Sequence, residues 1–418
     1  MLNRYFIRPT TVDRIRASWI GDAIERYVAW LAAQNYAARN VFVRVPILMR
    51  FGDFARRSGA SRFDELPGHV EPFVEDWLKR RKLGHSEWER RTAAQHVRNP
   101  IHQLLRLILP HHGNNSPGVP DPFVVSVPGF FDFLRRERGL SEATIVQYRH
   151  YLQRLQDYLL KADCPLPDLS PAVVSVFITE SGKTIDKRSV QSLCSILKTF
   201  FRYLYRTGLV TRDLSKVIES PRRYRFADLP RSIAWSEVEQ MLEKVDRRNP
   251  VGKRDYAILL LLVTYGLRAR EVAALSLDDV DWKRDRLHIR GRKAGHSTAY
   301  PLAATVGQAI LDYLRLGRPK TTERALFFRA FAPYTPVSGV AVSLRAKFYL
   351  RKSGVNVPRP GSHTLRHTCV QHLVDSGFSL KTIGDFVGHQ TPDATKIYAK
   401  VNIEALREVA LGDGEEVL

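Results

Sequence analysis

Residues 363–398 read HTLRHTCVQHLVDSGFSLKTIGDFVGHQTPDATKIY, a largely helical pattern that includes several chemically active side chains. His363 and Arg366 are three positions apart, so they lie on one face of a helix and can contact one phosphate. His389 follows a glycine, and Tyr398 stands nine residues after it. A tyrosine among apolar residues is usually a packing residue. Its role therefore depends on which other groups reach it.

Two cationic side chains upstream complete a candidate site. Arg268 follows the apolar run Tyr256–Tyr265 and a glycine, and it lies near Glu271, which can hold it in place. Lys293 lies in a predicted turn at 291–295, from which it can reach a ligand. Each residue alone is typical of a solvated surface. Only their combination indicates chemistry.

Together these residues describe a phosphoryl-transfer site that works without a metal. Arg268 and Arg366 are expected to bind the nonbridging oxygens of a phosphodiester, whose charge grows in the transition state. His363 and His389 would hydrogen-bond the same oxygens or handle the proton of the tyrosine. Lys293 would protonate the departing 5′ oxygen, while the tyrosine attacks the phosphorus. The predicted product is a covalent 3′-phosphotyrosyl enzyme.

A metal site is the alternative explanation of the histidines. His363 and His367 are four positions apart, but none of the three residues between them is the glutamate that a metalloprotease has in this interval. The adjacent arginine also repels a cation. A two-metal nuclease would need clustered carboxylates, whereas those near the site are scattered at Asp375, Asp385 and Asp393. We therefore expect no metal.

The ordered set resembles the active site of the tyrosine recombinases, the phage integrase family. Members have, in order, an arginine, a hairpin lysine, the motif HxxR, the pair GH and a tyrosine nine residues later. The chain matches each step, with Tyr398 as the nucleophile. The resemblance implies site-specific cleavage and rejoining of duplex DNA and no cofactor. It also implies self-association as dimers to tetramers on DNA, with sister recombinases as possible partners.

Two departures from the family pattern concern details. Arg292 stands in the hairpin where a lysine is common, so a neighbouring cation is the alternative to Lys293 as the acid. After the tyrosine, Ala399-Lys400-Val401 replaces the frequent ending that contains a histidine. Neither departure removes a catalytic residue.

The composition fits a DNA-binding protein. The 418 residues include 65 Lys and Arg against 43 Asp and Glu, a net charge of +22 that favours a polyanionic partner. The three scattered cysteines cannot form a disulfide framework and indicate a reducing compartment. The start has no apolar signal core, and the longest apolar run is about half a bilayer span. We expect a cytoplasmic, nucleoid-associated prokaryotic protein with no membrane partner.

The apolar periodicity predicts a mainly α-helical fold with one small β-hairpin or sheet. Helical spacing runs through residues 1–118, predicted to be an additional N-terminal DNA-binding module, and resumes through 119–218 after a loop-forming break. Residues 219–233 are a basic linker, and 234–418 are the catalytic domain with its tail. The resemblance implies that 119–218 is a core-binding, SAM-like domain, which forms a C-shaped clamp on DNA with the catalytic domain.

The two helical modules look alike. Aromatic and apolar residues at 27, 30 and 31 can be aligned with those at 130, 133 and 134. After an offset of one residue, a second set aligns as well, namely Val41, Leu48, Phe51 and Phe54 with Ile145, Leu152, Leu155 and Tyr158. This suggests a degenerate duplication of one module. Chance similarity of amphipathic helix pairs is the alternative.

Arginines concentrate in the linker and in the predicted hairpin, whose strands are expected at 287–290 and 298–302. We predict that they contact DNA phosphates, although a solvated surface is the usual role of such charge runs. The predicted contacts are Arg222, Arg223, Arg225, Arg231, Arg290 and Arg292.

Two other functions use much of the same pattern. A type IB topoisomerase has the same catalytic residues but relaxes supercoils as a monomer, and a noncatalytic recombination partner would keep the clamp without the reaction. The double helical N-terminal arrangement favours a recombinase of a mobile element. The sequence gives no reading of the target site, because most contacts of such a clamp are to phosphates.

Overall fold

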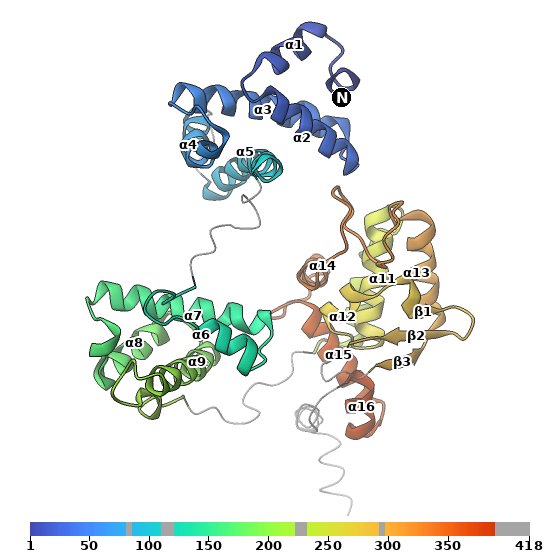
Figure 1. Ribbon diagram of the computed structural model, residues 1–418. Helices are drawn as coiled ribbons and strands as arrows, with labels where there is room; N and C mark the ends of the chain where they lie inside the picture. The colour runs from blue at the N-terminus through green and yellow to red at the C-terminus, as the bar shows by residue number, and fades with distance from the viewer. Residues whose placement is uncertain (81–85, 110–120, 222–231, 292–296, 389–418) are drawn as a thin grey trace, which may run out of the picture. The chain divides into compact units, whose positions relative to one another are not determined.

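Figure 1 shows the computed structural model of the chain, which describes residues 1–80, 86–109, 121–221, 232–291 and 297–388. The described residues are mostly helical, and one small sheet is present, which confirms the predicted fold class. None of the described helices has both the length and the apolar character needed to cross a bilayer.

The described residues of the first segment, 1–80 and 86–109, are mainly helical. Apolar residues at helical spacing are buried, among them Leu31, Leu48 and Phe51. The elements are η1 (Leu2–Arg4), α1 (Pro9–Ala17), α2 (Gly21–Ala33), α3 (Ala38–Arg57), η2 (Phe63–His69), α4 (Val70–Lys79) and α5 (Glu87–Ile108), where η marks a 3₁₀ turn.

The second segment, residues 121–221, has its own core of aromatic and aliphatic side chains, with Phe130, Phe200 and Phe201 fully or almost fully buried. Side-chain oxygens cap the N-termini of its three longest helices: Ser141 and Ser170 accept from backbone N–H groups at 3.4 Å, and Asp186 at 2.8 Å. The elements are α6 (Phe130–Asp132), a π turn η3 (Phe133–Glu137), α7 (Glu142–Lys161), η4 (Leu166–Asp168), α8 (Pro171–Thr184), α9 (Lys187–Arg206) and η5 (Leu214–Lys216).

The third segment, residues 232–388, packs helices around α11, whose apolar half, Ala257–Val263, is buried, and adds a small sheet. In Figure 1, α11 and α13 lie side by side next to the strands. The elements are α10 (Trp235–Glu243), α11 (Pro250–Thr264), α12 (Ala269–Ala274), η6 (Leu277–Asp279), β1 (Val280–Asp281), β2 (Arg286–Ile289), β3 (Thr298–Pro301), α13 (Ala304–Leu316), α14 (Gly339–Lys352), α15 (Ser362–Asp375) and α16 (Leu380–Val387).

The predicted hairpin is present. Strands β2 and β3 are antiparallel, with Ile289 opposite Thr298, so the hairpin turn lies between these two residues. Leu287 and Ile289 are buried while the residues between and before them are not, which is the alternation that predicted the strand. The edge strand β1 was not predicted, because two residues are too few to show a period.

A buried ionic network joins α11 to α14. The fully buried carboxylate of Asp255 accepts from the Arg254 guanidinium at 2.7 and 3.0 Å and from Arg345 Nε at 2.7 Å. The hydroxyl of Tyr349 donates to the same carboxylate at 3.2 Å. Burial raises the pKa of Tyr349, and the nearby negative charge of Asp255 raises it further. The network fixes α14 against the core of the segment.

We predict that Asp255→Ala lowers the free energy of unfolding of this segment by about 3–5 kcal/mol, because two arginines then lose their counter-charge. The measurement is urea unfolding of the full chain, followed by hydrogen exchange of α11 and α14 peptides. Asp246→Ala is the control, because its partner Arg248 has a side chain that is 91% exposed, and its effect should be much smaller. Equal effects of the two substitutions would contradict the prediction.

Candidate active site

The end of helix α16 is held by side chains from three other elements. The last carbonyl groups of a helix have no partner within the helix. Here the Phe386 carbonyl accepts from the Tyr300 hydroxyl, the Val387 carbonyl from Arg366 Nη2 at 2.7 Å, and the Gly388 carbonyl from Arg268 Nη2 at 3.0 Å. Both predicted catalytic arginines therefore meet at one helix end. The negative end of the helix dipole favours these cations.

Arg268 is positioned by its own turn of chain. It precedes α12, and Glu271 on that helix accepts from the Arg268 backbone N–H at 2.8 Å and from its Nη1 at 2.7 Å. The carboxylate side chain is only 4% exposed, whereas the arginine side chain is 20% exposed. The predicted role of Glu271 as the holder of Arg268 is confirmed. The guanidinium keeps contact with solvent while its orientation is fixed.

Arg366 lies on α15 and is buried, with 5% of its surface exposed. Besides the Val387 carbonyl, its guanidinium donates through Nη1 to the Gly266 carbonyl. Burial raises the pKa of the neighbouring Cys369 thiol to about 12, and the positive charge of Arg366 opposes this shift only in part. The thiol is therefore an inert packing group on the apolar side of the arginine.

Gly266 allows α16 to approach this cluster closely. Its φ of 58° lies in the left-handed region, which favours glycine. A Cβ atom there would stand 3.1 Å from Val387 Cγ1 and 3.2 Å from Cys369 Sγ. A side chain at this position would displace the helix end that both arginines bind.

His363 begins the same helix face as Arg366, as its spacing predicted, and its side chain is exposed. Three other predicted catalytic groups, Lys293, His389 and Tyr398, lie outside the described residues. Two of them, His389 and Lys293, are close in the sequence to residues of the observed cluster. Gly388, whose carbonyl binds Arg268, directly precedes His389, and β3, which contains Tyr300, follows the turn that contains Lys293.

The predicted DNA-contacting arginines are mostly beyond what the structure describes. Arg222, Arg223, Arg225, Arg231 and Arg292 fall in this group. Arg290 is described, and its Nε pairs with Asp279 at 2.6 Å while 66% of its side chain stays exposed. No group of three potential metal ligands is found among the described residues.

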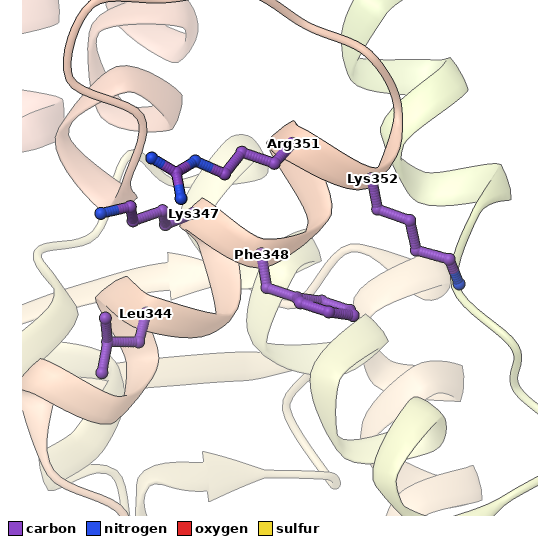
Figure 2. Close-up of a pocket in the computed structure, with 5 residues that line it drawn as sticks. All are labelled: Leu344, Lys347, Phe348, Arg351 and Lys352. Atoms are coloured by element: carbon purple, nitrogen blue, oxygen red, sulfur yellow. The ribbon is translucent and has the colours of Figure 1, made fainter. Parts of the chain in front are cut away.

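The sequence analysis missed a cationic face on α14. A shallow groove of about 620 Å³ is lined by Leu344, Lys347, Phe348, Arg351 and Lys352. Figure 2 shows Lys347 and Arg351 extending on the same side of the helix and Lys352 on the other side. The only sequence signal for this surface is the i, i+4 spacing of Lys347 and Arg351, which is common on surface helices. The structure adds that Leu344 and Phe348 beside them are exposed.

Comparisons with known proteins agree with this architecture. Residues 231–405 match the model of the phage integrase family, and residues 127–208 match that of its N-terminal SAM-like domain. The chain is similar to the putative integrase/recombinase y4rA of Sinorhizobium fredii, with 30% identity over 92% of each protein. It is 28% identical to the putative integrase/recombinase y4rF of the same organism over 98% of this chain and 95% of that one. Tyrosine recombinase XerC of Bacillus subtilis is 25% identical to this chain. That alignment covers 92% of XerC but only 66% of this chain.

Solved structures show the same fold. The XerH recombinase bound to palindromic difH aligns with a TM-score of 0.54 at 17% identity, over 67% of this chain and 82% of that one. A lambda integrase dimer bound to a COC′ core site aligns with a TM-score of 0.53 at 16% identity. This alignment covers 64% of this chain and 74% of that one. A SAM-like domain followed by a helical domain with clustered arginines is the architecture of an enzyme that cleaves and rejoins DNA. The chain belongs to the phage integrase family of tyrosine recombinases.

We predict that Gly266→Ala reduces DNA cleavage and destabilises the catalytic segment. The left-handed backbone costs about 1–2 kcal/mol for a residue with a Cβ, and overpacking adds about 1–3 kcal/mol. Gly354→Ala is the matched control, because Gly354 also has a positive φ of 81° but no atom within 4 Å of an added Cβ. Thermal melting and covalent trapping on DNA are the measurements. A Gly266 variant no worse than the Gly354 variant would refute the close approach.

Proposed function

We propose that this recombinase cuts and rejoins duplex DNA at specific sites through a 3′-phosphotyrosine on Tyr398, and that it serves a mobile genetic element. The convergence of Arg268 and Arg366 on the last two described carbonyls before His389 is the observation that supports the site assignment most directly. Two guanidiniums side by side can hold both nonbridging oxygens of one phosphodiester.

The roles of the residues follow from charge. The phenol is a weak nucleophile at its ordinary pKa near 10, so positive groups around it favour loss of its proton. Arg268 and Arg366 neutralise the oxygens as the five-coordinate phosphorus forms. His363 and His389 hydrogen-bond these oxygens or receive the proton, and Lys293 donates a proton to the leaving 5′ oxygen. The phosphotyrosine conserves the bond energy, so rejoining needs no cofactor.

Arg268 is prepared for this role before DNA arrives. Its donors to Glu271 and to the Gly388 carbonyl hold the guanidinium plane, while a guanidinium has five N–H groups in all. The bonds that fix the group in place therefore use only some of its donors. Preorganised donors stabilise developing charge without a free-energy cost for their reorganisation during the reaction.

The partner is duplex DNA, bound by more than one protomer. The similar XerH and lambda integrase structures are complexes with difH and with a core site, the latter of a dimer. We infer the same kind of assembly here, dimer to tetramer, with sister recombinases as possible partners and a cytoplasmic, nucleoid-associated location. The cationic face of α14 contributes phosphate contacts, as do the arginines of the linker.

We further propose the domain division 1–118, 119–218, 219–233 and 234–418. The SAM-like match at 127–208 and the family match at 231–405 support the second and fourth parts.

The topoisomerase alternative is tested by asking whether the protein joins two marked duplexes or only relaxes plasmids of any sequence. Joining of two duplexes is the expected result.

We predict that Tyr398→Phe abolishes covalent attachment to nicked suicide duplexes but leaves noncovalent binding unchanged, because only the nucleophilic oxygen is lost. The measurement is denaturing gel electrophoresis of the protein after reaction with a nicked duplex library of random sequence. Tyr334→Phe, in a loop of the same segment, should trap as much DNA as the wild type. Equal trapping by the Tyr398 variant would end the catalytic assignment.

We predict that Lys347→Ala with Arg351→Ala reduces the magnitude of the salt slope of DNA affinity by about 2, because two phosphate contacts are lost. Affinity is measured on a duplex of arbitrary sequence at increasing salt. A double variant of the exposed cations Lys320 and Lys283 removes the same charge from another surface. An identical change in both double variants would mean that α14 has no specific contact.

A further inference from the structure

Three helices of the first segment, α3, α4 and α5, correspond in order to α7, α8 and α9 of the second segment. Adding 104 to the bounds of α3 (Ala38–Arg57) gives the bounds of α7 (Glu142–Lys161). The same shift places the buried Val41, Leu48 and Phe51 on residues that are also buried, namely Ile145, Leu152 and Leu155. In both segments a 3₁₀ turn separates this helix from the next. The equal lengths of α3 and α7 and the turn that follows each of them add to the match of the buried positions.

The repeat includes a specific aromatic contact. Phe54 of α3 lies against Phe73 of α4, with ring centroids 5.5 Å apart. The equivalent rings, Tyr158 of α7 and Phe177 of α8, are 5.1 Å apart. Charged residues around this pair correspond as well, with Arg50, Asp53, Arg57 and Asp76 in the first segment and Arg154, Asp157, Lys161 and Glu180 in the second.

Helices α5 and α9 correspond with a shift of 96. The smaller shift reflects the connections, because α4 and α5 are separated by residues 80–86, whereas only residues 185–186 separate α8 from α9. Five buried apolar positions of α5 coincide with buried positions of α9, pairing Ala94, Val97, Ile101, Leu104 and Leu105 with Val190, Leu193, Leu197, Phe200 and Phe201. Cys194 and Leu204 of α9 are buried as well, whereas their counterparts Arg98 and Ile108 are only partly buried. The side of each helix away from the core can therefore be compared position by position.

A polar stripe occupies equivalent positions on these two helices. On α5 it consists of Arg91, Gln95, His102 and Arg106, and on α9 of Lys187, Gln191, Lys198 and Arg202. The spacings of four, seven and four residues keep each stripe on one helix face. Its two ends, Arg91 and Arg106, are exposed, as are Lys187 and Arg202. By contrast, Arg98 of α5 pairs with Glu71 at 2.8 Å and is not part of the stripe.

The charge balance supports a polyanionic ligand for the first segment. Residues 1–109 contain 19 Lys and Arg against 11 Asp and Glu, while residues 121–221 contain 14 against 11. The segment without a SAM-like match is thus the more basic of the two. A structural spacer would not need this excess.

We propose that residues 1–109 are a second copy of the SAM-like module and that the α5 stripe binds the phosphates of duplex DNA. This inference rests on the proposed function, since it concerns the DNA on which the same enzyme acts. The similarity to y4rF, which covers 98% of this chain, includes the first segment, whereas similarity to XerC covers 66%. The second copy therefore lengthens the bound duplex beyond that held by the two-domain relatives.

The test is the double variant Arg91→Ala and Arg106→Ala in the full chain. We expect the magnitude of the salt slope of affinity for a long duplex of arbitrary sequence to fall by about 2 and the protected footprint to shorten. Arg91→Lys with Arg106→Lys should keep both, because the charges remain. Arg14→Ala with Arg39→Ala, which removes exposed charges from α1 and α3, should change neither.

Covalent trapping on the nicked library separates this inference from the proposed function. If the wild type forms no adduct, the function fails whatever the stripe does. If the wild type forms an adduct and the α5 variant keeps the full slope and footprint, the DNA-binding stripe is wrong. Lys187→Ala with Arg202→Ala is the matched change on α9, and a similar loss of slope in the two double variants is expected if the modules are equivalent.

Discussion

The active-site segment depends on the end of one short helix. The last carbonyls of α16 would be unsatisfied inside the protein, and Tyr300, Arg366 and Arg268 supply their donors from a strand, a helix and a loop. A buried carbonyl without a partner costs about 1–3 kcal/mol, so three of them would not be tolerated together. The same bonds that satisfy the backbone thereby bring the two guanidiniums to one place. The same hydrogen bonds therefore satisfy the end of α16 and hold Arg268 and Arg366 close together.

The sequence predicted the parts of the site that depend on local spacing. His363 and Arg366 share a helix face because they are three residues apart, and Glu271 holds Arg268 because both lie in one helical turn. The strands β2 and β3 were predicted because alternation over four residues is visible in a sequence. The family assignment followed from the order of these motifs, and the comparisons confirm it.

Other features could not be predicted, because they depend on contacts or on side-chain exposure that only the folded chain defines. The hydrogen bond from Arg268 to the Gly388 carbonyl joins positions 120 residues apart, and no local sequence pattern predicts it. The groove on α14 was missed because its cations look like ordinary surface residues until the exposure of Phe348 beside them is known. Asp255 would also be expected at a surface, and only the structure shows that Arg254, Arg345 and Tyr349 surround it in the core.

The arrangement around Gly388 links ligand binding to conformation by reciprocity. A phosphate bound by Arg268 and Arg366 would polarise the same guanidiniums that donate hydrogen bonds to the carbonyls at the end of α16. If such an anion binds more tightly when the helix end is docked, docking must be favoured by the anion to the same degree. The glycine, with its φ of 67°, is the point at which the chain leaves the helix. Binding of the anion and docking of α16 would then be positively coupled, so that each increases the population of the other.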